Sequence, residues 1–297
     1  MILGPTAVGK SAIALEIAEK LNWEILSCDS RQVYRKMNIG TAKPAPCQME
    51  RVRHWLIDIL DPSESYSAFG FTEDALRIIR DRAACGKTVL ICGGTGLYFK
   101  CLSEGITAPL DSDLVIREKL MSDAQNQGVS FLYNQLCEKD PDSASRIHPN
   151  DLQRIVRALT VFLQTGIPFS KMRTVKKVAD DLEFKVVKLT CERNMLYERI
   201  NNRVMEMIND GLWEEFHQLV AQGYHERSAG LQCVGYKELF SCFKGESSLS
   251  EAVALIQRNS RRYAKRQITW FTHQVSGTEF DAFVGYEVLI DHFLGEL

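Results

Sequence analysis

The stretch Gly4-Pro5-Thr6-Ala7-Val8-Gly9-Lys10-Ser11 decides the fold of this chain, because it fits the pattern G-x-x-x-x-G-K-[ST] at every fixed position. Residues 1–3 before it can close a short strand, and residues 11–21 after it have the pattern of an amphipathic helix. Backbone N–H groups of such a loop, with the N-terminus of the following helix, form a cradle for phosphate oxygens. The sequence therefore predicts binding of a diphosphate or triphosphate. An ordinary glycine-rich turn is the alternative, and the order strand, loop, helix argues against it.

Two side chains of this loop carry further chemistry. Lys10 adds a mobile positive charge, and the Ser11 hydroxyl suits a magnesium ion that is shared with the phosphates. We therefore expect Mg²⁺ as a cofactor and Ser11 as its protein ligand. The same loop serves kinases, switches and transferases, so the motif alone leaves the reaction open.

Composition narrows the class of protein. With 45% hydrophobic and 25% charged residues, the chain is typical of a soluble globular protein, and no apolar run approaches the ~20 residues that span a membrane. Nine scattered cysteines without a C-x-x-C pair predict reduced thiols in a cytoplasmic protein rather than a zinc site. The net charge of −2 gives no overall reason to expect nucleic acid, although residues 258–266 concentrate five cations without an acid between them.

The first hundred residues alternate between strand and helix. Residues 24–29 and 88–92 have the pattern of buried strands, and residues 72–84 have that of a helix. This order predicts an α/β fold, a P-loop NTPase-like parallel sheet flanked by helices on both faces. Ligands of such sheets bind at the carboxyl ends of the strands, so Asp29 and Thr95 are expected on the same rim as the loop 4–11.

The sequence pattern changes between residues 111 and 181, where no strand-like run occurs. Helical patterns cover residues 114–125, 131–139 and 152–165, so we expect an inserted all-helical subdomain at 111–181. The sheet would then consist of a first part, 1–110, and a second part, 182–297. Within the second part, residues 183–190 return to strand, and helices are expected at 193–209, 212–222 and 249–271.

Three groups of residues on this rim could carry chemistry. Asp29 could hold magnesium or accept a proton, and its alternative role is a helix N-cap. The glycines around Thr95 let backbone approach a ligand, with one hydroxyl for a phosphate oxygen. Arg199 and Arg203, four residues apart on one helix, suit bidentate contacts with phosphate, whereas a solvated helix face is the alternative.

Two further stretches are candidates for contacts with RNA. Residues 261–271 mix cations, which neutralise phosphates, with aromatic rings, which stack on unpaired bases. Trp270 and Phe271 fit a buried helix end equally well. Gln153, Arg154 and Arg157 could contact an RNA backbone or only solvent.

Seven segments together resemble the bacterial tRNA dimethylallyltransferase family, in order and with matching spacing from residue 4 to about residue 271. They are Gly4–Ser11, Asp29–Tyr34, Asn38–Pro44, Gly93–Tyr98, Ile147–Asp151, Cys233–Tyr236 and Lys265–Phe271. The resemblance implies transfer of a dimethylallyl group from dimethylallyl diphosphate to the exocyclic N6 amine of adenosine 37, just 3′ of the tRNA anticodon. We also expect a monomer without a membrane partner.

The resemblance further implies roles for individual residues. Asp29 would be the general base, Ser11 would lie near magnesium and diphosphate, and Thr95 and Arg203 would contact the diphosphate. The helical insertion would grip the anticodon stem. The residues expected to contact tRNA are Asp29, Ser30, Arg31, Gln32, Thr95, Arg117, Gln153, Arg154, Ile155, Val156, Arg157, Gln232, Cys233, Val234, Gly235, Tyr236, Lys237, Arg262, Lys265, Arg266 and Gln267.

Three alternatives stay open at this point. Adenylate prenyltransferases are related enzymes that use a free nucleotide, and the segments expected to contact the anticodon argue against them. A P-loop small-molecule kinase would need a purine pocket and an arginine-rich lid. A non-catalytic, nucleotide-gated RNA-binding module would bind tRNA without needing Asp29.

Overall fold

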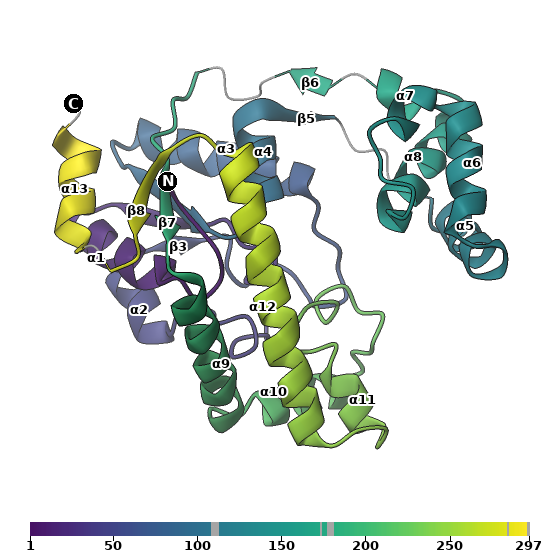
Figure 1. Ribbon diagram of the computed structural model, residues 1–297. Helices are drawn as coiled ribbons and strands as arrows, with labels where there is room; N and C mark the ends of the chain where they lie inside the picture. The colour runs from purple at the N-terminus through teal and green to yellow at the C-terminus, as the bar shows by residue number, and fades with distance from the viewer. Residues whose placement is uncertain (108–112, 173, 177–180, 284, 296–297) are drawn as a thin grey trace. The chain divides into compact units, whose positions relative to one another are not determined.

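Six parallel strands form the central sheet of the larger of two units in the computed structural model (Figure 1). The model describes residues 1–107, 113–172, 174–176, 181–283 and 285–295. The strand order is β3-β2-β4-β1-β7-β8, with β1 Ile2–Leu3, β2 Glu24–Ser27, β3 His54–Trp55, β4 Val89–Gly93, β7 Val187–Thr190 and β8 Thr278–Asp281. Ile2 and Leu3 point to opposite faces and both are fully buried, so both faces of the sheet are covered. The predicted α/β sheet flanked by helices is confirmed.

The position of β1 creates the crevice in which a ligand can bind. Ile2 pairs with Cys92 of β4 on one side and with Val187 of β7 on the other. The chain first leaves β1 toward β2 and later returns to β7 on the opposite side. Where connections diverge in this way, a crevice opens at the carboxyl ends of the strands. The loop 4–11 follows β1 directly at this point.

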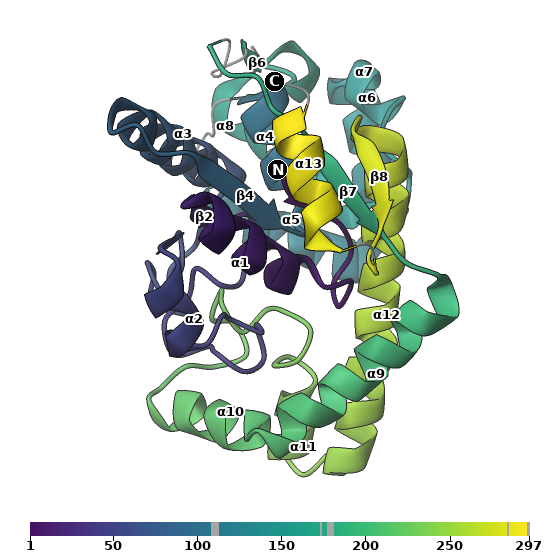
Figure 2. The same cartoon turned by 90° about the vertical axis from the view of Figure 1, so that its left-hand side faces the viewer.

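Nine helices are described in the larger unit: α1 Lys10–Leu21, α2 Pro46–Arg51, α3 Ala68–Ala84, α4 Gly96–Glu104, α9 Arg193–Asn209, α10 Leu212–Ala221, α11 Leu239–Phe243, α12 Leu249–Gln274 and α13 Tyr286–Gly295. Figure 2 shows α1 beside α13, and α4 packs against both α3 and α12. Buried residues of β1, α1 and β7, including Ile2, Ile17 and Leu189, form the core beneath the sheet. No helix of the described segments combines the length and the apolar character that a membrane span requires.

A second core lies among α9, α10, α11 and α12. Phe216, Tyr236 and Ile256 are among its buried residues. Helix α12 begins with a capping box, in which Ser248 and Glu251 satisfy each other's backbone N–H groups, and then runs alongside α9 (Figure 1). The predicted helix 193–209 is confirmed, and the predicted helices 212–222 and 249–271 are confirmed with ends at 221 and 274.

The smaller unit, Gly105–Val178, has a core of its own that includes Leu132, Leu136 and Leu159. It contains α5 Leu114–Gln127, α6 Val129–Lys139, α7 Pro141–Ala144, α8 Leu152–Thr165 and the 3₁₀ turn Phe169–Lys171. Strands β5 Gly105–Thr107 and β6 Thr174–Lys176 pair antiparallel. The helices of the predicted insertion are present as α5 to α8, whereas the short strands β5 and β6 were not predicted. Strands of three residues show no readable period, and pairing between segments so distant in the chain leaves no local pattern.

The edges of the sheet also differ from expectation. The two-residue β3 and the polar β8 were not predicted, since edge strands this short carry no clear alternation. Strand β7 covers only the second half of the predicted strand 183–190. Helix α3 begins four residues before the predicted start at 72, because the Ser67 hydroxyl caps it by accepting a hydrogen bond from the Gly70 N–H.

Candidate active site

The loop 4–11 turns sharply between β1 and α1. Ala7 and Gly9 have φ values of 63° and 107°, in the left-handed region. A Cβ atom on Gly4 would lie 2.7 Å from the Leu189 carbonyl oxygen, so the loop can approach β7 only with glycine there. Lys10 Nζ donates to the Pro5 carbonyl at 2.6 Å, so its side chain folds back across the loop.

A cavity of about 490 Å³ lies against this loop, and we call it the loop cavity. It is lined by Ala7, Gly9, Lys10, Ser11, Ala12, Ala42, Arg199, Asn202, Arg203 and Glu206. Burial lowers the pKa of Lys10 to about 8, and burial also lowers the pKa of Arg203, against the opposing charge of Asp29. Partly desolvated cations are stabilised by an anion, so the loop cavity favours a phosphate-bearing ligand.

The two arginines of α9 also hold the loop in place. Arg199 Nε donates to the Ala7 carbonyl at 2.9 Å, and its guanidinium lies over the Phe283 ring at 5.5 Å. Arg203 Nη1 donates to Thr6 Oγ1 at 3.3 Å. A solvated helix face is therefore the wrong interpretation of this arginine pair, because both side chains are half-buried and contact the loop.

A second cavity, of about 340 Å³, adjoins the first, and we call it the rim cavity. The two share Ala7 and Arg203 in their linings. The rim cavity is lined by Thr6, Ala7, Asp29, Ser30, Arg31, Gly40, Thr41, Ile200, Arg203, Val204, Met207, Gln232, Cys233, Val234, Gly235, Lys237, Ile256, Ser260, Tyr263 and Arg266. The structure thus brings together Asp29, Arg203 and most of the predicted segment 232–237.

Helix α9 contributes to both cavities, which sequence reasoning missed except at its arginines. Residues 199, 202, 203 and 206 line the loop cavity, and residues 200, 203, 204 and 207 line the rim cavity. Both sets of positions recur at helical spacing, so two neighbouring faces of α9 line the two cavities, and Arg203 belongs to both. The alternation of polar and apolar residues in 199–207 could have indicated that this helix lines a cavity.

Asp29 lies at the carboxyl end of β2 and lines the rim cavity. Its Oδ1 accepts a hydrogen bond from the Arg31 N–H at 2.8 Å, which is the geometry of an Asx turn. Residues 30–33 form turns rather than a helix, so the alternative role of Asp29 as a helix N-cap is wrong. The Asp29 carboxylate therefore lies at the rim cavity and does not cap a helix.

Thr95 braces the Asp29 turn instead of lining either cavity. Its hydroxyl accepts from the Ser30 N–H at 3.1 Å, and its own N–H donates to the Cys28 carbonyl at 3.2 Å. A Cβ atom on Gly93 would lie 2.1 Å from that carbonyl oxygen, so β2 and β4 meet there through glycine. Contacts of Thr95 with diphosphate or tRNA stay a prediction.

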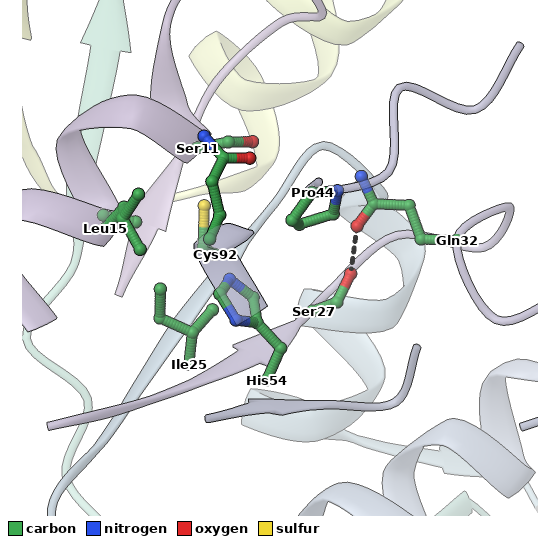
Figure 3. Close-up of a pocket in the computed structure, with 10 residues that line it drawn as sticks. Ser11, Leu15, Ile25, Ser27, Gln32, Pro44, His54 and Cys92 are labelled. Atoms are coloured by element: carbon green, nitrogen blue, oxygen red, sulfur yellow. Dashed lines mark hydrogen bonds between the residues drawn. The ribbon is translucent and has the colours of Figure 1, made fainter. Parts of the chain in front are cut away.

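A third cavity, of about 30 Å³, lies behind Ser11 (Figure 3). Ser27 Oγ donates to Gln32 Oε1 at 2.8 Å across its wall, and Gln32 Nε2 donates to the Ala42 carbonyl. Burial lowers the pKa of His54, whose Nδ1 pairs with the Val52 carbonyl. The space suffices for about one water molecule, so it is a packing gap rather than a ligand site.

Glu215 fastens the segment 38–44 to the molecule. Its carboxylate accepts hydrogen bonds from the N–H groups of Asn38, Ile39 and Gly40 at 2.8, 3.0 and 3.3 Å. The Tyr236 hydroxyl donates to the same carboxylate at 2.5 Å, and a Cβ atom on Gly40 would lie 2.5 Å from the tyrosine ring. Tyr236 is fully buried, so the structure gives no support to its predicted contact with tRNA.

Replacing Glu215 by glutamine is expected to lower the free energy of unfolding by about 3 kcal/mol, because an NH₂ group would face backbone N–H donors. Urea denaturation followed by circular dichroism measures the change. Glu214→Gln on the same turn of α10 is the control, since Glu214 is exposed and should cost under about 1 kcal/mol. Equal losses in the two variants would contradict the assigned role of Glu215.

Helix α12 divides the predicted RNA stretch into buried and exposed positions. Gln267 is 6% exposed and its amide bonds Thr6 and Gly94, so the structure gives no support to its predicted contact with tRNA. Arg262, Lys265 and Arg266 are exposed, and Arg266 also lines the rim cavity. At the helix end, the core interpretation is confirmed, since Phe271 is buried and the Trp270 ring fills the space beside Gly96.

The predicted contacts in the smaller unit divide in the same way. Ile155 and Val156 are buried in its core, so the structure gives no support to their predicted contacts with tRNA. Arg117 and Gln153 are exposed, as is Arg154, which pairs with Asp151 at 3.4 Å, while Arg157 is half-buried. For these four polar side chains, contact with tRNA stays a prediction.

Comparison with known proteins identifies the family of this chain. The family model described as IPP transferase matches residues 32–274. The tRNA dimethylallyltransferase of Geobacter metallireducens is 46% identical over 91% of this chain and 88% of its own length, and that of Thermotoga maritima is 45% identical over 90% and 87%.

The solved structures that resemble this chain carry names of the same kind. The tRNA isopentenylpyrophosphate transferase of Staphylococcus epidermidis has a TM-score of 0.71 at 36% identity, covering 99% of this chain and 97% of its own. A eukaryotic dimethylallyltransferase crystallised while acting on tRNA has a TM-score of 0.75 at 26% identity, covering 99% and 76%. Since the family model matches well over half of the sequence, this chain belongs to the IPP transferase family.

Proposed function

We propose that this protein transfers a dimethylallyl group from dimethylallyl diphosphate to the N6 amine of adenosine 37 in tRNA. The observation that carries the proposal is the adjacency of the two cavities. One holds Lys10, Arg199 and Arg203 around the phosphate loop, and the other presents Asp29. The names of the relatives, tRNA dimethylallyltransferases, support the same reaction.

The donor's diphosphate fits the loop cavity. Backbone N–H groups at the start of α1 and the three cations complement its charge. The allylic carbon would then face the place where the two cavities meet, at Ala7 and Arg203. Because negative charge develops on the leaving oxygen, cations placed there stabilise the transition state more than the ground state.

The acceptor adenine fits the rim cavity. Its N6 atom attacks C1 of the allyl group, and the C1–O bond breaks with its electron pair leaving on the diphosphate. The proton released from N6 passes to the Asp29 carboxylate, which lines this cavity. A base in a loop has no pairing partner, so turning it out of the stack costs only a few kcal/mol.

The residues present fit a magnesium ion in the loop cavity. The Ser11 hydroxyl and the Glu206 carboxylate both line it, and Mg²⁺ prefers oxygen ligands of this kind together with phosphate oxygens. We propose that Ser11 holds the ion and that the ion, when bound, neutralises part of the diphosphate charge.

The exposed cations of α12 would hold the RNA backbone. Reversing the charge of Lys265 and Arg266 together to glutamate is expected to weaken tRNA binding and to lower the slope of log K against log salt by about two, one for each lost phosphate contact. Filter binding at several salt concentrations measures the slope. Lys20→Glu with Arg77→Glu, on α1 and α3, is the matched control, and an equal slope in both double variants would assign Lys265 and Arg266 to folding.

We further propose that the enzyme works as a monomer in the cytoplasm. The side chains that the proposed reaction uses, Lys10, Asp29 and Arg203, line cavities formed within one chain, which is what a monomeric enzyme requires. All nine cysteines are free thiols, which suits a reducing compartment, and tRNA is a cytoplasmic substrate.

The deciding experiment incubates the purified protein with unmodified tRNA, dimethylallyl diphosphate and Mg²⁺, and then analyses the digested nucleosides by mass spectrometry. One prenyl unit gained on adenosine 37 supports the proposal. Prenylation of free adenylate but not of tRNA would indicate the adenylate prenyltransferase reaction. Folded protein without either product would overturn the proposal in favour of a kinase or a binding module.

A further inference from the structure

We propose that Gln267 is a positioning residue that couples RNA binding on α12 to the donor loop. Its Oε1 accepts a hydrogen bond from the Thr6 N–H at 2.9 Å, and its Nε2 donates to the Gly94 carbonyl at 2.8 Å. One buried amide thereby joins α12 to the loop after β1 and to the loop after β4.

The surroundings require a glutamine amide at this position. A Cβ atom on Gly94 would lie 2.5 Å from Gln267 Nε2, so glycine is what lets the amide reach the carbonyl. A glutamate would offer an acceptor to Thr6 but no donor to Gly94, and a methionine would leave both backbone groups without a strong partner. Since its N–H is engaged by Gln267, Thr6 contributes to donor binding through position rather than as a phosphate donor.

The same helix turn faces the acceptor. Tyr263, one turn before Gln267, lines the rim cavity, and so does the adjacent Arg266. On the donor side, the Thr6 hydroxyl accepts from Arg203, which lines both cavities. If α12 shifts when RNA binds, the Gln267 amide would therefore move Thr6 and with it the loop that holds the diphosphate.

This inference rests on the proposed function, in which the donor occupies the loop cavity and RNA contacts α12. It adds that the two substrates favour each other's binding. Coupling of this kind changes affinity about 5- to 150-fold, and it does so reciprocally. We expect about tenfold in the wild-type protein, and close to onefold when the amide link is lost.

The test measures binding of magnesium pyrophosphate by calorimetry, with and without an unmodified anticodon stem-loop RNA. The variants are Gln267→Glu, Gln267→Met and Gly94→Ala, the last of which breaks the same contact from the other side. The control is Thr269→Ala, two residues along α12, where the exposed hydroxyl only bonds the Lys265 carbonyl of its own helix. Each variant is also tested for RNA binding without pyrophosphate.

We expect the wild-type protein and Thr269→Ala to bind pyrophosphate about tenfold more tightly with RNA, and the other variants to lose this difference while binding RNA alone within twofold of wild type. A wild-type ratio of one overturns the inference whatever the variants do, and so does an unchanged ratio in any folded variant at Gln267 or Gly94. Prenylation by the wild-type protein is assayed alongside, so that failure of the proposed function is seen separately.

Discussion

Asp29→Asn is expected to lower kcat by about 10²- to 10⁴-fold, the usual contribution of a general base, while tRNA binding stays within about threefold of wild type. Asparagine keeps the Oδ1 acceptor for the Arg31 N–H, so the turn that places residue 29 is preserved. What is lost is the carboxylate that takes the N6 proton. Single-turnover prenylation with saturating tRNA and donor measures the change.

The control is Asp210→Asn, an exposed carboxylate at the end of α9, which should leave kcat unchanged. A loss of less than tenfold in Asp29→Asn would remove Asp29 from the role of base. A non-catalytic binding module would show the same tRNA binding in Asp29→Asn, but it would form no product even in the wild-type protein, so product formation distinguishes the two hypotheses.

The parts of the site that could be predicted from the sequence are those that local geometry or sheet topology determines. The loop 4–11 is a local motif, and its neighbours identify it. Asp29 follows a strand, and the carboxyl ends of parallel strands meet at one rim, so its position was predictable before any contact was known. Arg199 and Arg203 follow from helical spacing.

The parts that could not be predicted depend on contacts between distant segments. Glu215 bonds three N–H groups roughly 175 residues away, and Gln267 bonds Thr6 across 261 residues, and neither has a local pattern. Tyr236 and Ile155 were predicted to contact tRNA because of the segments that contain them. Their burial is decided by the helices packed against them, which one segment alone does not reveal.

Arg203→Ala is expected to lower kcat/KM for dimethylallyl diphosphate by about 10²- to 10³-fold, comparable to the loss of one preorganised donor at a developing oxyanion. Arg203 lines both cavities, so its charge lies where the C1–O bond breaks. Because that charge grows in the transition state, kcat should fall as well as donor affinity. Steady-state kinetics with varied donor and saturating tRNA separates the two parameters.

Arg203→Lys distinguishes charge from shape at this position. Lysine restores the positive charge but not the planar set of N–H groups, one of which donates to Thr6 Oγ1. If charge alone is needed, Arg203→Lys should recover most of the lost kcat/KM. If the planar guanidinium must hold both the loop and the diphosphate, kcat/KM of Arg203→Lys should stay within about tenfold of that of Arg203→Ala. Arg193→Ala, exposed at the start of the same helix, is the control. Wild-type kinetics in Arg203→Ala would show that the leaving diphosphate lies elsewhere, since no group at the junction of the two cavities could be removed without affecting its departure.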